Sequence, residues 1–386
     1  MKYIRTYDTR EKFLADKDST SRGFRLVPTL YKYSDESGDE NNRDHIYLEL
    51  DDPRKHEGST YMEITLNSNV EFSFYIGNKS DDTQTTMTCT IDWGDGTVET
   101  KTITKDDKGF KLAHSYVAGS YKIELYDVER DYSVVGLYNT SLISHPSSVK
   151  RIVLDERVVS IGKYAFSGCS SLTSVNIPEK VTSIGNGVFN GCSSLTSIDI
   201  PEGITSIGNG VFGGCSSLTS IDIPERVTKI NNNTFRSCIS LTSIHIPEKV
   251  TSIESGAFFG CGKIVSIYIP ESVTSIGDSV FGNCSSLKSI YLPEGITTIN
   301  QYAFSKCSSL KSIDIPEKVT SIEDSAFEGC SSLTSISSFN PTTLTLGGNI
   351  FLNLPTNGTL HIKPGATGYD VWLSKLPEGW RIVEDL

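Results

Sequence analysis

A 23-residue motif dominates the chain from residue 149 onward. Residues 188–230 contain it nearly twice over, as VFNGCSSLTSIDIPEGITSIGNGVFGGCSSLTSIDIPERVTKI. Three residue types recur at this spacing: Cys169, Cys192, Cys215, Cys238, Cys261, Cys284, Cys307 and Cys330; Pro178, Pro201, Pro224, Pro247, Pro270, Pro293 and Pro316; and Phe166, Phe189, Phe212, Phe235, Phe258, Phe281, Phe304 and Phe327. A fixed period of this length predicts a solenoid, because one unit cannot bury its apolar face without its neighbours.

The repeat reads L-T-S-I-x-I-P-E-x-V-T-S-I-G-x-x-x-F-x-G-C-S-S, and it divides into two apolar segments. In LTSIDI (195–200), two-residue alternation directs Leu195, Ile198 and Ile200 inward and Asp199 outward. Each coil is therefore expected to give one short parallel strand, stacked on the next at about 4.8 Å. The stretch VTSI (181–184) forms a second wall, and Gly185 after it indicates a turn with positive φ.

The cysteine column allows more than one interpretation. Stacked Cα atoms about 5 Å apart lie within disulfide range, but parallel Cβ vectors that all point into the core have the wrong geometry for a bridge. A metal ladder would need other ligands beside each sulfur, and the repeat supplies no partner histidine. We expect buried, reduced thiols that pack as small hydrophobic groups.

A glutamate column runs through the same repeats and is expected to lie in solvent. Its alternative interpretation, a cation-binding stripe, is disfavoured because exposed single carboxylates are weak ligands. Basic residues sit beside it and offset its charge. The glutamates are Glu156, Glu179, Glu202, Glu225, Glu248, Glu271, Glu294 and Glu317, and the basic residues are Lys180, Arg226, Lys249 and Lys318.

Both ends of the array depart from the repeat. The first coil has Asp155 where later coils have proline, which suits an entry coil. At the far end, GTLHIKPGATGYDVWLSKLPEGWRIVEDL predicts one more strand at 360–362, a short helix over 369–376 and a plug formed by Trp372 and Trp380. Exposed solenoid ends must be covered, so residues 341–386 are expected to be a cap.

Residues before the repeats follow a different pattern. Runs such as YMEITL, VEFSFYI, MTCTIDW and SYKIELYDV alternate as strands of a small β-sandwich, with Cys89 in one of them. In DWGDGT (92–97), Asp95-Gly96 predicts a hairpin; a calcium site is the alternative, but EF-hand spacing is absent. Residues 1–50 predict a short helix and two strands. They lack the apolar segment of a secretory signal peptide, so none is expected.

Two of these patterns resemble known families. Residues 149–386 resemble the BspA-like leucine-rich repeats, the 23-residue cysteine-bearing type found on bacterial surfaces. DWGDGT followed by HSYVAGSYKIEL (114–125) resembles a PKD-type immunoglobulin-like domain. Residues 1–50 look, more loosely, like the opening modules of virion proteins from Bacteroidales phages, where such a module anchors the protein to the virion.

The expected fold class is mainly β: a leucine-rich-repeat solenoid with a parallel β-sheet, preceded by an Ig-like β-sandwich and a small α+β N-terminal module. The expected domains are an anchoring module (1–55), the PKD/Ig-like sandwich (56–140), the solenoid (141–340) and the cap (341–386).

Composition and motifs exclude several functions. The net charge of −12 disfavours nucleic-acid partners, and no apolar run approaches the roughly 20 residues of a membrane span. The sequence has no nucleophile elbow, P-loop or Rossmann fingerprint, and its six histidines show no metal-ligand spacing. We expect no enzymatic activity, no metal and no cofactor.

Binding is expected where the repeats differ from one another. The outward strand position reads Asn176, Asp199, Asp222, His245, Tyr268, Tyr291, Asp314 and Ser337. Aromatic faces beside carboxylates suit a sugar or a peptide, so we predict a ligand-binding site at Asp222, His245, Tyr268, Tyr291 and Asp314. The alternative is that tyrosine simply stabilises exposed strands.

Two functions fit these predictions. The first is a phage virion fibre or decoration protein: residues 1–55 contact other virion proteins, and the solenoid binds a host surface glycan or protein. The second is a bacterial cell-surface adhesin, which is extracellular and uses the same binding face. A carbohydrate-active enzyme, the third class, has no support in the sequence.

Overall fold

The computed structural model describes residues 6–7, 46–47, 60–76, 86–104, 110–126, 132–134, 143–338 and 345–385. The chain divides into two compact units, Met1–Ser59 and Thr60–Leu386. In the first unit, β1 (Thr6–Tyr7) pairs antiparallel with β2 (Ile46–Tyr47), which lies in the predicted HIYLEL strand. The predicted helix and the RLVPTLYKY strand lie outside the described residues, so the α+β module stays a prediction.

The second unit begins with antiparallel strands. These are β3 (Thr60–Leu66), β4 (Val70–Ile76), β5 (Thr86–Asp92), β6 (Val98–Thr104), β7 (Phe110–Tyr116) and β8 (Gly119–Tyr126), followed by the short β9 (Tyr132–Val134). Strands β3, β8, β5 and β6 are neighbours in one sheet, and β4 pairs with β7 in another. Alternate residues of β3 and β5 are apolar and buried, which gives the sheet one face toward the core, whereas the edge strand β6 has no buried residue.

The DWGDGT hairpin is confirmed. The backbone N–H of Trp93 donates to the carbonyl of Thr97 at 3.0 Å and closes the turn between β5 and β6. Both aspartates are used locally, since Asp92 accepts from the N–H of Gly94 and Asp95 from that of Thr97, each at 2.9 Å. These contacts support the turn interpretation of the two carboxylates.

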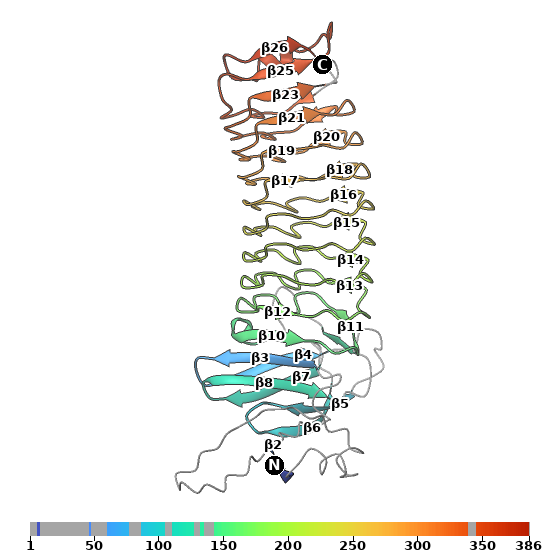
Figure 1. Ribbon diagram of the computed structural model, residues 1–386, viewed down its shortest axis with the longest axis vertical. Coiled ribbons are helices and arrows are strands. Elements are labelled where there is room, and N and C mark those ends of the chain that lie inside the picture. The colour runs from blue at the N-terminus through green and yellow to red at the C-terminus, as the bar shows by residue number, and fades with distance from the viewer. Residues whose placement is uncertain are drawn as a thin grey trace. The chain divides into compact units, whose positions relative to one another are not determined.

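The repeats form a solenoid of stacked coils with two walls of short parallel strands (Figure 1). The VTSI wall comprises β11 (Val158–Ile161), β13 (Ser183–Ile184), β14 (Ser206–Ile207), β15 (Lys229–Ile230), β16 (Ser252–Ile253), β18 (Ser275–Ile276), β20 (Thr298–Ile299), β22 (Ser321–Ile322) and β24 (Thr345–Leu346). The LTSI wall comprises β10 (Val149–Val153), β12 (Ser174–Val175), β17 (Ser266–Ile267), β19 (Ser289–Ile290), β21 (Ser312–Ile315), β23 (Ser335–Ser338), β25 (Thr359–Ile362) and β26 (Arg381–Glu384).

The pairing register follows the sequence period. Ser183 lies opposite Ser206, and Ser206 is 23 residues further along the chain. The walls differ in regularity, because LTSIDI at 195–200 has no regular strand while the VTSI wall does. One short parallel strand per coil was expected from the LTSIDI segment; instead, the VTSI wall supplies the regular strands, and the LTSI wall adds a second strand in only some coils. Leu195 and Ile198 are nevertheless buried as predicted, because stacking requires only that the apolar residues of successive coils superpose.

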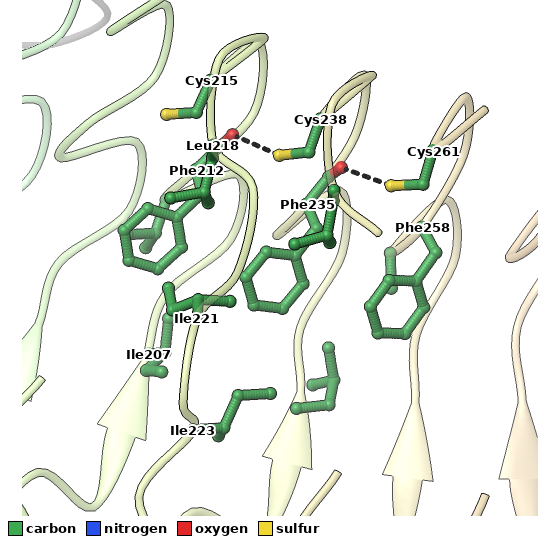
Figure 2. Close-up of a cluster of buried hydrophobic side chains, with 14 of the residues drawn as sticks. Ile207, Phe212, Cys215, Leu218, Ile221, Ile223, Phe235, Cys238, Phe258 and Cys261 are labelled. Atoms are coloured by element: carbon green, nitrogen blue, oxygen red, sulfur yellow. Dashed lines mark hydrogen bonds between the residues drawn. The ribbon is translucent and has the colours of Figure 1, made fainter. Parts of the chain in front are cut away.

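Columns of identical side chains fill the space between the walls (Figure 2). The phenylalanine rings stack from coil to coil, with centroids 5.5–5.7 Å apart between Phe166 and Phe327. Beside them the cysteines are free and buried, as predicted. Each thiol from Cys192 to Cys330 donates to the carbonyl of a phenylalanine in the preceding coil; for Cys238 and Phe212 the distance is 3.1 Å.

The expected role of Gly185 is wrong. Its φ is not in the left-handed region; instead, an added Cβ would lie 2.7 Å from the backbone nitrogen of Lys163 in the preceding coil. Close approach of two backbones, rather than turn conformation, selects glycine here. The left-handed positions come later in the coil, at Gly187 (φ 62°) and Gly191 (φ 76°).

The solenoid continues directly from the N-terminal sheets. After the 3-10 turn Pro146–Ser148, β10 pairs antiparallel with β3, and β11 pairs parallel with β9. Asp155, at the proline position of the first coil, accepts from the Thr60 hydroxyl at 3.3 Å and forms an ion pair with Arg157 at 2.9 Å. Two walls of the solenoid thus gain a strand from the preceding segment. The predicted domain boundaries stay predictions.

The C-terminal end adds strands β25 and β26 with helix α3 (Asp370–Leu373) between them, within the helix predicted over 369–376. Trp372 stacks on Phe351 at 5.7 Å and is buried, so it extends the phenylalanine column. Trp380 is also buried and donates through Nε1 to the carbonyl of Pro355 at 2.7 Å. Strand β26 was not predicted; it pairs parallel with β25 and ends the LTSI wall.

Candidate ligand-binding face

The variable column of the LTSI wall lies in solvent. We use this name for Asn176, Asp199, Asp222, His245, Tyr268, Tyr291, Asp314 and Ser337. All but the half-buried Ser337 are exposed. The residues on either side of each are buried, as Ile267 and Ile269 are around Tyr268, or half-buried, as are Ile200 and Ile244, so backbone alternation turns the column outward.

The structure places the five predicted site residues on consecutive coils of one wall. Asp222 and His245 form a parallel bridge. Tyr268 and Tyr291 directly follow the paired strands β17 and β19, and Asp314 lies in β21, beside β19 in the stack. The two tyrosines are 53% and 48% exposed, so about half of each residue's surface is open to a partner.

Two glutamates reach this column, a feature that sequence reasoning missed. Nε2 of His245 lies 3.3 Å from Oε1 of Glu225, and the Tyr291 hydroxyl donates to Oε1 of Glu271 at 2.6 Å. In both pairs the glutamate precedes its partner by 20 residues, three fewer than the period. Each contact therefore joins the end of one coil to the strand of the next. This spacing of 20 residues is the sequence signal that could have predicted contacts between the glutamate column and the variable column.

The contact with Glu271 fixes the position and ionisation of Tyr291. Because the hydroxyl donates to a carboxylate, the pKa of Tyr291 is raised to about 12. The other oxygen of Glu271 accepts from the backbone N–H of Glu294 at 3.2 Å. One carboxylate thus links two coils beside the tyrosine pair.

The charge beside the tyrosines differs from that of most other coils. Elsewhere a lysine or arginine commonly follows the glutamate: Arg157, Lys180, Arg226, Lys249 or Lys318. In the two tyrosine coils this position is Ser272 or Gly295, so no basic residue follows Glu271 or Glu294 in the sequence. Gly203 likewise follows the glutamate of a coil whose residue in the variable column is Asp199. The two exposed tyrosines therefore lie in coils whose glutamates are not followed by a basic residue.

In the described ranges, no group of three or more His, Cys, Asp or Glu is placed to hold a metal ion. No helix of the described part is long and apolar enough to cross a bilayer. His114, which matches the β-sandwich pattern, stacks on Trp93 at 5.0 Å and contacts Asp95 at 2.7 Å, so it is part of the packing around the DWGDGT turn.

Comparison with solved structures finds leucine-rich repeat proteins. One from Bacteroides ovatus is 23% identical, with 80% of this chain and 100% of that chain covered and a TM-score of 0.34. One from T. pallidum is 30% identical over 47% of this chain and 77% of its own, with a TM-score of 0.34. A leucine rich cell surface protein from Faecalibacterium prausnitzii is 24% identical over 62% and 80%, with a TM-score of 0.30.

The comparison with curated proteins finds no match. The comparison with family models does: BspA type leucine rich repeat regions match residues 142–265 and 251–363, which together span more than half of the chain. These ranges contain every coil whose cysteine, phenylalanine and isoleucine columns were described above. The chain belongs to the BspA-type leucine-rich repeat family.

Proposed function

We propose that this protein is a non-enzymatic adhesin of a bacterial cell surface, which binds a surface glycan or protein through the variable column. The observation that carries the proposal is the pair Tyr268 and Tyr291, both exposed and adjacent on a wall whose other positions are nearly uniform. Selection for packing explains the uniform positions, whereas exposed aromatic residues of this kind are enriched where proteins bind partners.

Family membership supports a surface location, since the BspA-like repeats that the chain resembles are a type found on bacterial surfaces. The PKD-like assignment of the N-terminal sheets fits as a spacer. It is supported by the DWGDGT turn and by the packing of Phe74 of β4 against Trp93, whose ring centroids are 6.2 Å apart at 68°. That contact joins the β4–β7 pair to the larger sheet, as a sandwich requires.

The virion role predicted for residues 1–55 gains no support from the comparisons. It rests on a segment of which the structure describes only β1 and β2. Contacts between that segment and other virion proteins therefore stay a prediction, and the adhesin is the function proposed.

The test compares binding of the fluorescently labelled chain and its variants to a glycan array and to bacterial and epithelial cells. The double variant Tyr268→Ser/Tyr291→Ser should lose at least about tenfold in affinity, as removal of central aromatic contacts does. Tyr302→Ser is the matched control, because Tyr302 is 41% exposed but lies outside the variable column. Unchanged binding by the double variant would show that the tyrosines only stabilise the wall.

The absence of catalysis is part of the same proposal. No set of described side chains offers an acid, a base and a nucleophile in contact with one another. The purified chain should leave every member of a glycan panel intact, and cleavage of any of them would contradict the proposal.

A further inference from the structure

We infer that the tyrosine pair binds a basic segment of a partner protein, through lysine or arginine side chains. The inference rests on the proposed function, because it names the chemistry of the ligand for the same face. It follows from what surrounds Tyr268 and Tyr291 rather than from the rings alone.

The first step concerns the rings. Tyr268 and Tyr291 are 53% and 48% exposed, and they follow neighbouring strands, whose spacing is about 4.8 Å. The face of an exposed tyrosine ring carries a negative quadrupole, which attracts an ammonium or guanidinium group. The Tyr268 hydroxyl has no hydrogen-bond partner among the described residues, whereas the Tyr291 ring is held by Glu271.

The second step concerns the available hydrogen-bonding groups. Glu271 and Glu294 are exposed and acceptor-only when ionised. Glu271 uses one oxygen for Tyr291 and the other for the N–H of Glu294, which fixes its position while leaving acceptor capacity on both. Carboxylates match the donors of lysine and arginine, whereas a neutral sugar also needs donors from the protein. An acidic glycan would be repelled.

The third step concerns the basic residues that follow the glutamates in other coils. A lysine or arginine follows the glutamate in five coils, yet Ser272 and Gly295 take that place beside the tyrosines. The nearest lysine in the same segment, Lys288, lies just before the strand that precedes Tyr291, while Glu294 follows the end of that strand. At the carboxyl end of these strands, two successive glutamates thus lack the basic residue that follows the glutamate in most coils, and a basic partner would supply that positive charge.

The experiment measures binding of fluorescein-labelled octa-arginine and octalysine to the full chain by fluorescence anisotropy. A fully acetylated octalysine of the same length serves as the neutral probe. We expect the basic peptides to bind and the acetylated peptide not to bind, with affinity falling about tenfold or more between 50 and 500 mM NaCl as the charges are screened.

Matched variants separate this face from the overall negative charge of −12. Glu271→Gln should weaken peptide binding about fivefold, while Glu202→Gln, at the equivalent position of a coil without tyrosine, should leave it unchanged. Ser272→Lys imitates Lys249 of the neighbouring coil and should weaken binding about tenfold, with Gly203→Lys as its control. Equal losses in each pair of variants would overturn the inference, because binding would then reflect net charge alone.

The outcome also separates this inference from the proposed function. If Tyr268→Ser/Tyr291→Ser abolishes cell binding while the basic peptides do not bind, the face is an adhesive surface for another chemistry and the inference is wrong. If neutral glycans on the array bind in competition with octa-arginine, the inference is likewise overturned. Loss of neither cell nor peptide binding in the double variant would reject both.

Discussion

At the scale of single residues, the thiols of the cysteine column are held protonated by their surroundings. Cys215 is fully buried, and its thiol donates to the carbonyl of Phe189 at 3.2 Å. Burial raises the pKa of Cys215, like that of Cys261, from 9.0 to about 12. Such thiols are poor nucleophiles and poor metal ligands, so the column contributes packing rather than chemistry.

This shift predicts a stability that depends on alkaline pH. Because the folded-state pKa is raised, the contribution of Cys215 is complete below about pH 9, where both states are protonated. Between about pH 9 and 12 the unfolded chain loses its proton first, and the free energy of unfolding falls by about 1.4 kcal/mol per pH unit for each such thiol. Denaturant unfolding of the wild type at a series of pH values measures the slope.

Tyrosines and lysines titrate in the same range, so Cys215→Ala supplies the control. Its free energy of unfolding should be lower at pH 7, because a buried side chain is truncated. Above about pH 9 it should fall less steeply than that of the wild type, and the difference in slope is the contribution of one thiol. Parallel curves for wild type and variant would mean that the thiol ionises equally easily in both states.

At the scale of the structural element, each coil depends on the ring stacked above and below it. Phe258 is fully buried, with the rings of Phe235 and Phe281 5.5 and 5.6 Å away. Phe258→Ala should lower the free energy of unfolding by about 3–5 kcal/mol, since it leaves a cavity in a column that cannot collapse without shifting both neighbours. Coils on either side should also lose hydrogen-exchange protection, because solenoid stability depends on nearest-neighbour contacts.

The adjacent residue provides the control for this prediction. Phe259 is only half-buried, and its ring lies 4.3 Å from the guanidinium carbon of Arg236. Phe259→Ala should cost about 1 kcal/mol, the value of an exposed cation–π contact with little burial. Similar losses for the two variants would show that the phenylalanine column is not the source of the coil's stability.

The inward and outward positions of a coil could be predicted from the sequence because nearly every position of the motif recurs after 23 residues. Spacing placed Leu195, Ile198 and the phenylalanine and cysteine columns inside, and alternation placed Tyr268 and Tyr291 outside. It missed the contacts that depend on distances between coils: the backbone approach at Gly185, and the reach of Glu271 to the tyrosine of the next coil. Strand β26 was missed because it pairs outside the repeat, where no period indicates a partner.

At the scale of the second unit, the N-terminal strands close one end of the solenoid. β3 covers the free edge of β10 and β9 covers that of β11, so neither wall ends in an unpaired strand on that side. This joint was not predicted, because both pairings join segments that are distant in the sequence, β3 and β10 by nearly 90 residues, and such pairing leaves no local pattern in either segment. It gives the N-terminal sheets a structural role that a separate spacer would not have.

The joint predicts the behaviour of truncated chains. A chain of residues 143–386 exposes the edges of β10 and β11, and exposed flat edges pair with other molecules. We expect this chain to form oligomers or precipitate at micromolar concentrations and to unfold at a lower temperature than the full chain, as shown by size-exclusion chromatography with light scattering and by calorimetry. A chain of residues 60–386 retains β3 and β9 and is the control; it should match the full chain in both measurements. If residues 143–386 also match the full chain, the solenoid closes its own end, and the pairing of β3 with β10 adds a module without stabilising the stack.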